Sequence, residues 1–253
     1  MNFLLALYKE LTEQWRTHRW LIVGAVFIGF GLASPLLARL TPQLLRTIPN
    51  MPPGLAEIIP EPTLADAVTQ YVKNLSQFGI LLALLMSMGS IAQEKERGTA
   101  ALLLSHSPSR LSFLLAKFTA LAILFAANLL LAALGGWYYT LLLFAPLPWR
   151  AFLALNGLML VVFLVYIAVA LLCSTLARSQ GAAAALAFAA LLIIGLVSAL
   201  PGLEQYAPSR LFAWGSALVL GDSLTAWPAL GVSLTMLVMA LGAAGWLFQR
   251  QEL

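Results

Sequence analysis

The chain alternates between long apolar runs and short polar segments. A helix needs about 20 apolar residues to cross the hydrocarbon core of a bilayer. Six runs qualify, at residues 20–38, 75–92, 113–137, 151–176, 181–200 and 229–248. Lys117 is the one charged residue in these runs, and its position one turn into the third suits a side chain that snorkels to the membrane surface. The pattern predicts an all-α integral membrane protein in which residues 1–253 form a single transmembrane domain.

The composition agrees with a membrane protein. Hydrophobic residues make up 61% of the chain and charged residues only 9%, against roughly 25% charged residues in soluble domains. The net charge is +4, but the basic residues are scattered at the ends of apolar runs and form no basic stripe. We therefore expect them to set the topology beside anionic lipid, and we expect no nucleic-acid partner. Cys173 is the only cysteine, which excludes an intramolecular disulfide and a cysteine-cluster metal site.

The distribution of positive charge predicts that both termini are cytoplasmic. With that orientation the inner segments hold Lys9, Arg16, Arg19, Lys95, Arg97, Arg110, Lys117, Arg178 and Arg250. The outer segments hold fewer basic residues, namely Arg39, Arg46, Lys73, Arg150 and Arg210. Cytoplasmic loops of membrane proteins carry the excess of Lys and Arg, so the bias favours termini on the inside.

The amino-terminal arm, residues 1–19, has an amphipathic pattern. Its apolar residues recur at steps of 4, 3 and 4 and so share one helical face: Leu4, Tyr8, Leu11 and Trp15. Polar residues lie on the other side: Lys9, Thr12, Glu13 and Arg16. The arm is predicted to be an interfacial helix on the inner leaflet, the alternative being an extension of the first span.

Two outer segments have their own patterns. Residues 39–73 are rich in proline, and a short helix is predicted at "TLADAVTQYVKNL", with Thr63 as its N-cap and Asp66 in its first turn. Residues 201–228 are too apolar for an ordinary loop and too short to span. They predict a re-entrant or interfacial helix pair with Trp214 and Trp227 at the level of the lipid headgroups.

The most polar stretch is "QEKERGTAALLLSHSPSR", residues 93–110. Gly98 favours a left-handed helix end, Thr99 suits the cap of a short lateral helix, and Ser107 with Pro108 suits the start of the third span. The lateral helix would present an apolar face to a groove of a partner: Leu102, Leu103 and Leu104. The residues before it would form a polar rim: Glu94, Lys95, Glu96 and Arg97. The alternative is that these charges only mark the membrane border.

These residues carry a resemblance to a known family. Its signature here comprises Glu94, Glu96, Gly98, Thr99, Leu102, Leu103, Leu104, Pro108, Ser109, Arg110 and Lys117, with "YAPSR" at 206–210 before the last span. The chain resembles ABC-2-type transporter permeases. It is similar in particular to the compact six-helix permeases grouped with multicopper-enzyme maturation and nitrous oxide reductase assembly. The resemblance implies a prokaryotic cytoplasmic membrane and a cytoplasmic ABC ATPase whose cleft holds the lateral, or coupling, helix.

The resemblance also implies roles for neighbouring segments. The amino-terminal arm would be the connecting helix, which includes Lys9, Glu10, Leu11 and Trp15. Many relatives have an acidic residue where this chain has Ala100 and Ala101. That departure leaves the polar contact with the ATPase to Glu94, Glu96 and Arg97.

Several functions are disfavoured by what the sequence lacks. None of the four lysines follows a glycine, so there is no phosphate-binding loop, and ATP with Mg²⁺ is expected in a partner chain. His18 and His106 lie at inner borders without a ligand pattern, so we expect no catalytic residue, no metal and no bound cofactor. Three polar residues in spans are interpreted as helix–helix hydrogen-bond partners: Asn128, Asn156 and Tyr166. The absence of carboxylates at span centres argues against an ion-coupled transporter.

Two functional hypotheses follow. The first is the permease subunit of an ATP-driven exporter of a hydrophobic substrate, and the alternative is a membrane scaffold that transmits ATPase motion to an outer maturation partner. Either would need a second six-span half, identical or similar. Gly181, Ala185 and Ala189 recur every four residues and would let another helix approach closely. They are a candidate dimer seam, with internal packing as the open alternative.

Overall fold

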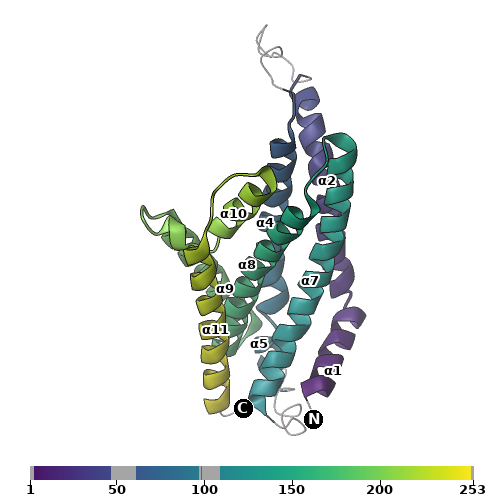
Figure 1. The fold of residues 1–253 in the computed structure, drawn as a ribbon. Coiled ribbons are helices and arrows are strands. Elements are labelled where there is room, and N and C mark those ends of the chain that lie inside the picture. The colour runs from purple at the N-terminus through teal and green to yellow at the C-terminus, as the bar shows by residue number, and fades with distance from the viewer. Residues whose placement is uncertain (1–2, 47–60, 97, 99–108, 252–253) are drawn as a thin grey trace.

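A computed structural model describes residues 3–46, 61–96, 98 and 109–251. In this part of the chain every regular element is a helix, and short turns or extended residues join the helices (Figure 1). The α-helices are α1 (Phe3–Arg16), α2 (Arg19–Arg46), α4 (Leu64–Ser87), α5 (Ala92–Glu96), α7 (Arg110–Leu143), α8 (Trp149–Leu176), α9 (Gln180–Ala199), α10 (Arg210–Leu220) and α11 (Trp227–Arg250). A short 3₁₀ helix, η1 (Glu204–Tyr206), precedes α10.

The prediction of six spans is confirmed. Six helical segments are long and apolar enough to cross a membrane: Arg19–Gln43, Leu64–Glu96, Arg110–Leu143, Trp149–Leu176, Gln180–Ala199 and Trp227–Arg250. Both chain ends lie at the same end of this bundle (Figure 1). We call it the terminal end and the opposite one the distal end.

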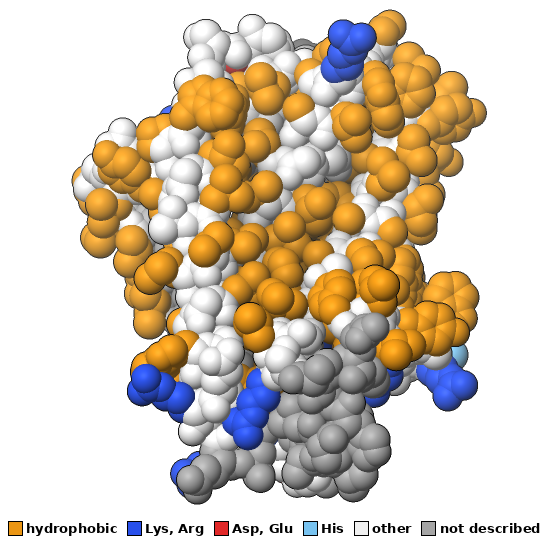
Figure 2. Space-filling model, turned by 60° about the horizontal axis from the view of Figure 1, so that its bottom comes forward, with side chains coloured by type: hydrophobic (Ala, Val, Ile, Leu, Met, Phe, Trp, Pro, Cys, Tyr) orange, Lys and Arg blue, Asp and Glu red, His pale blue; other side chains and the backbone are white. Residues whose placement is uncertain are grey.

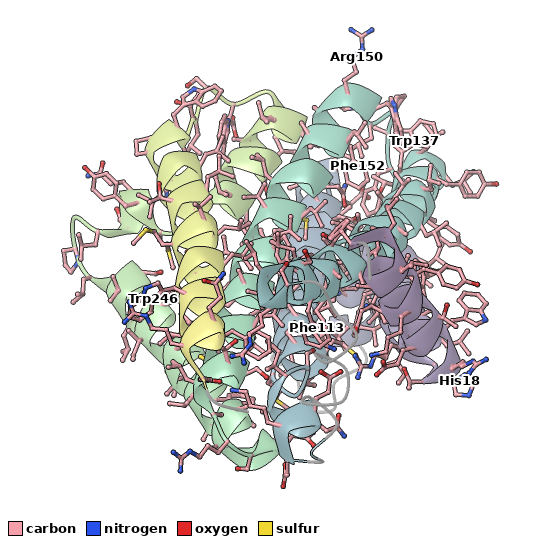
Figure 3. All side chains as sticks on the ribbon, turned by 90° about the horizontal axis from the view of Figure 1, so that it is seen from below. His18, Phe113, Trp137, Arg150, Phe152 and Trp246 are labelled. Atoms are coloured by element: carbon pink, nitrogen blue, oxygen red, sulfur yellow. The ribbon has the colours of Figure 1, made fainter. Side chains whose placement is uncertain are left out.

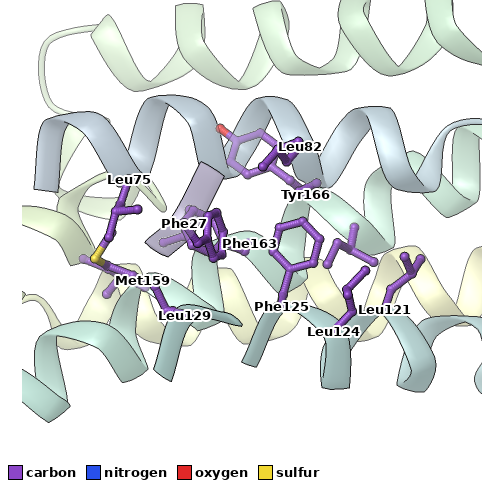
Figure 4. Packing of buried hydrophobic residues seen from close by; sticks show 14 of the residues in the cluster. Phe27, Leu75, Leu82, Leu121, Leu124, Phe125, Leu129, Met159, Phe163 and Tyr166 are labelled. Carbon is purple, nitrogen blue, oxygen red and sulfur yellow. The ribbon is translucent and has the colours of Figure 1, made fainter. Parts of the chain in front are cut away.

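Helix α8 is the centre of the bundle. It packs against α4, α7, α9, α10 and α11, and 61% of its most apolar stretch is buried, against 11% for α9. Aromatic rings fill the core beside it (Figure 4). Phe27 lies 5.5 Å from Phe125 and 5.7 Å from Phe163, measured between ring centroids. Ring pairs at these distances contribute about 0.5–1.5 kcal/mol beyond the burial of their area.

Helices α2 and α7 approach each other closely at a glycine. A Cβ atom at Gly31 would lie 2.6 Å from the backbone oxygen of Ala132 on α7. A glycine is therefore required for this backbone contact, as in small-residue packing of membrane helices.

The distal segment before α4 differs from the prediction in one respect. The N-cap is confirmed, because the Thr63 side chain accepts from the Asp66 amide and the Asp66 carboxylate accepts from the Thr63 amide. The separate short helix predicted over 63–75 is wrong, since α4 runs unbroken from Leu64 to Ser87. No helix breaker follows the cap, and a continuous buried stripe that includes Leu75 holds the helix against the core. Helix α2 likewise continues to Arg46, into the segment predicted as a loop.

The segment 201–228 forms the predicted short helices, η1 and α10. Helix α10 ends at Gly221 in the left-handed conformation, with φ of +81°. It packs on α4 and α8, and a Cβ at Gly215 would lie only 2.4 Å from the Leu155 side chain. Trp227 is exposed, whereas Trp214 is buried with 6% of its surface exposed and its ring 4.9 Å from that of Trp227. Trp214 is therefore a packing residue of the bundle, and the depth of α10 in a bilayer stays a prediction.

Candidate functional site

The two segments that flank residues 97–108 meet the ends of the other helices at the terminal end (Figure 3). Helix α4 stops at Ser87, and α5, which carries Glu94, Lys95 and Glu96, starts after a turn. Gly98 has φ of +68°, which confirms the predicted left-handed helix end. Helix α7 begins at Arg110 with Ser109 as its N-cap, two residues after the predicted start at Pro108.

A serine from α8 stabilises the turn between α4 and α5. The amides of Ile91 and Ala92 both donate to the Ser174 hydroxyl oxygen, each at 3.0 Å. Ser174 is fully buried, and these are amides that the first turn of a helix leaves without an intrahelical partner. The joint between the two helices is thus attached to the end of α8.

Lys117 of α7 is bound to two glutamates. Its ammonium donates to both carboxylate oxygens of Glu10 on α1, at 3.0 and 3.1 Å, and to Oε1 of Glu94 on α5, at 2.9 Å. Only 4% of the Lys117 side chain is exposed. The snorkelling side chain predicted for Lys117 is therefore wrong. The charge is paired inside the protein, as a buried charge must be.

Two further cations bind the carboxyl ends of helices. Lys95 donates to the Thr175 carbonyl and to the Gln251 side chain, the latter at 2.6 Å. Arg110 donates to the Phe248 carbonyl at 2.8 Å and to the backbone oxygen of Gln251. Cations near these free carbonyls are stabilised by the helix dipole. Both flanks of residues 97–108 are thereby attached to the ends of α8 and α11.

Glu96 is attached to the start of α9. Its Oε2 accepts from the Gln180 amide at 3.0 Å, where a carboxylate is favoured by the helix dipole. Glu94, Lys95 and Glu96 thus all have partners within the chain, although the sequence assigned them to a rim facing an ATPase. Arg97 of the predicted rim lies outside the described residues. So do five residues predicted for the coupling helix and its flanks: Thr99, Leu102, Leu103, Leu104 and Pro108. So does His106.

Helix α1 is amphipathic as predicted, and its apolar face points away from the bundle. Leu4, Tyr8 and Trp15 are 72%, 71% and 69% exposed. The buried residues of α1 are instead Ala6, Glu10 and Gln14, which face α7. Leu11 is half-buried, and Lys9 lies 3.8 Å from Glu10 and 3.9 Å from Glu13. The pattern of apolar residues alone gave no sign that Glu10 is buried.

Charged and aromatic side chains mark the two ends of the bundle. Figure 2 shows Lys and Arg gathered at the terminal end, below a broad apolar surface. Trp15, Trp20 and Trp246 lie on helix segments toward this end, and Trp137, Trp149, Trp214 and Trp227 on segments at the distal end. Such aromatic belts are typical of the two membrane interfaces.

The small residues of α9 are open to the surroundings. Gly181, Ala185 and Ala189 are exposed, whereas Ala183 and Ala187 are fully buried against the bundle. The alternative of internal packing is therefore wrong for the first three. They remain a candidate seam for another helix.

The polar residues in spans have different roles. The Tyr71 hydroxyl of α4 donates to Oδ1 of Asn156 on α8 at 2.7 Å, so Asn156 is the predicted helix–helix partner. Asn128 instead donates to the Leu124 carbonyl of its own helix. Tyr166 is buried in the core.

Comparison with known proteins decides the family. A family model described as "ABC-2 family transporter protein" matches residues 6–253. The chain belongs to the ABC-2 transporter family. It is also 25% identical over 262 residues to "Uncharacterized transmembrane protein YxlG" of Bacillus subtilis (strain 168), with 100% of this chain and 99% of that protein covered. The ABC-2 membership confirms the family predicted from the sequence and makes the protein a multi-pass permease component of an ABC transporter. The family implies partnership with an ABC ATPase and, usually, with a second permease.

Proposed function

We propose that this ABC-2 protein is the membrane-spanning subunit of an ATP-driven exporter of a hydrophobic substrate, with the terminal end in the cytoplasm. A separate ATPase chain would bind ATP and Mg²⁺ and engage the loop at residues 97–108. The permease subunit itself would be non-catalytic. The observation that carries the proposal is the set of contacts that tie both flanks of this loop to α1, α7, α8, α9 and α11.

These contacts suit the transmission of force. A displacement of the loop pulls on Glu94, Lys95 and Glu96 on one side and on Arg110 on the other. Charge-assisted hydrogen bonds are about twice as strong as neutral ones, so the flanks would move with the helix ends they bind. The ATPase stroke would therefore reach the bundle as a whole.

A second permease half would complete the transport path. The exposed face of α9 is where we place it, because Gly181, Ala185 and Ala189 present little steric bulk there. The half would be identical or similar to this chain.

The proposal is tested by co-purification from the native host in mild detergent. Charge reversal of Glu94 and Glu96 is unsuitable, since both hold other helices of the chain. The informative variant changes Leu102, Leu103 and Leu104 to Ser, and Leu142→Ser at the distal end is the control, since Leu142 is 62% exposed.

We expect an ABC ATPase to co-purify with the wild type and the control but not with the triple variant, while all three insert. A wild type that retains no ATPase in several detergents would overturn the proposal. An ATPase that binds without any ATP-dependent release of hydrophobic compounds would favour the scaffold hypothesis.

A further inference from the structure

Helix α1 has little apolar contact with the bundle. The face it buries against α7 consists of a small residue and two polar ones, Ala6, Glu10 and Gln14. Its large apolar side chains are either half-buried, as Phe3 and Leu11 are, or exposed, as Leu4, Leu5, Tyr8 and Trp15 are. Hydrophobic burial scales with the apolar area removed from contact with the surroundings, so it contributes little to holding α1 on α7.

The contact that holds α1 is therefore electrostatic. The Glu10 carboxylate is bound through both oxygens, and its side chain is only 9% exposed. A lysine ammonium has three N–H donors, and the hydrogen bonds of Lys117 to Glu10 and Glu94 join α7 to α1 and to α5. The Phe113 ring, 4.8 Å away, adds a cation–π contact that fixes the ammonium.

The two glutamates depend on this lysine to stay together. Each carboxylate lies about 3 Å from the same nitrogen. Without Lys117, two like charges would face each other in a buried place, which is unfavourable for both. Removal of the lysine should separate α1 from α5.

We propose that Lys117 is a positioning residue that locks α1, α5 and α7 into one unit, so that a displacement of the loop at 97–108 moves α1 together with α7. The lock itself follows from the contacts of this chain. Its use in transport rests on the proposed function.

The lock is tested on the chain alone in nanodiscs, by electron paramagnetic resonance distances between spin labels. Labels replace Tyr8 on α1 and Ile123 on α7, both exposed, in a Cys173→Ala background. The variants are Lys117→Met and Glu10→Ala, the second because it changes only the peripheral helix. Lys117→Arg keeps the charge, and Arg16→Gln is a control that removes an exposed charge from the same helix α1.

We expect one narrow distance distribution in the parent, in Arg16→Gln and in Lys117→Arg. In Lys117→Met and Glu10→Ala the population with a detached α1 should rise about tenfold or more, since a broken buried ion pair costs several kcal/mol. Unchanged distributions in both of these variants would overturn the lock.

Transmission is tested in the complex with the co-purified ATPase. The labels are then on Tyr8 and on Leu196 of α9, which is also exposed. We expect ATP with vanadate to shift this distance in the parent and in Lys117→Arg, but not in Lys117→Met. If nucleotide moves no label in the parent complex, transmission fails while the lock stands. If the shift persists in Lys117→Met, the positioning role is wrong and the proposed function is untouched.

Discussion

Replacement of Ser174 by Ala removes the hydroxyl that holds the joint between α4 and α5. The hydroxyl oxygen accepts the amides of Ile91 and Ala92, each at 3.0 Å. All three residues are at most 1% exposed, so water cannot take over the lost contacts. Ser174→Ala should therefore leave two buried N–H groups without an acceptor.

The expected cost follows from these two amides. A buried donor left unsatisfied costs about 1–3 kcal/mol, so the loss of both contacts should lower the free energy of unfolding by about 2–6 kcal/mol. Ser87→Ala is the matched control, because Ser87 is also fully buried but only donates to the Ala83 carbonyl of its own helix, at 2.6 Å. Its loss should cost less than about 1 kcal/mol, since α4 keeps its backbone hydrogen bonds.

The assay is reversible unfolding of the two variants and the wild type in mixed micelles, titrated with a denaturing detergent. A secondary readout is hydrogen exchange at Ile91 and Ala92, which should accelerate only in Ser174→Ala. Equal destabilisation by both substitutions, or unchanged exchange at the joint, would refute the assignment of Ser174 as its anchor.

Three further substitutions test the packing. Gly31→Ala should destabilise the bundle by about 1–3 kcal/mol, because its Cβ would press on a backbone oxygen of α7. Gly29→Ala, two residues away, meets open space and should be neutral or slightly stabilising in the same unfolding titration, since alanine is the better helix former. Tyr71→Phe should cost about 1–2 kcal/mol, since it leaves a buried amide oxygen of α8 without its donor. Ala185→Leu should weaken dimerisation measured by cross-linking without changing monomer stability, whereas Ala183→Leu, at a fully buried position, should destabilise the monomer. Unchanged dimerisation in Ala185→Leu would exclude the α9 seam.

Local signals made much of the fold predictable. The spans follow from uninterrupted apolar runs, whose length alone fixes them as helices that cross a bilayer. The cap at Thr63 with Asp66 and the left-handed Gly98 follow from chemistry within three or four residues. Where a boundary depended on tertiary packing, as in the continuous α4, the prediction was wrong.

The candidate site depended on contacts that are distant in sequence. Lys117 at the start of an apolar run fits a snorkelling side chain as well as a buried pair, and its partners are 107 and 23 residues away. Ser174 lies 82 residues from the amide of Ala92 and looks like any small residue of a span. Neither position has a local pattern that identifies its partner, so only the folded arrangement reveals the site.

The central claim is that the loop at residues 97–108 is the contact with an ATPase. The most direct measurement places a photo-cross-linking amino acid at Leu103, with Leu142 at the distal end as the control position, and identifies the products by mass spectrometry after irradiation in native membranes. We predict a cross-link to an ABC ATPase from Leu103 and none from Leu142. Cross-links from Leu103 only to lipid, or an ATPase captured equally from Leu142, would contradict it.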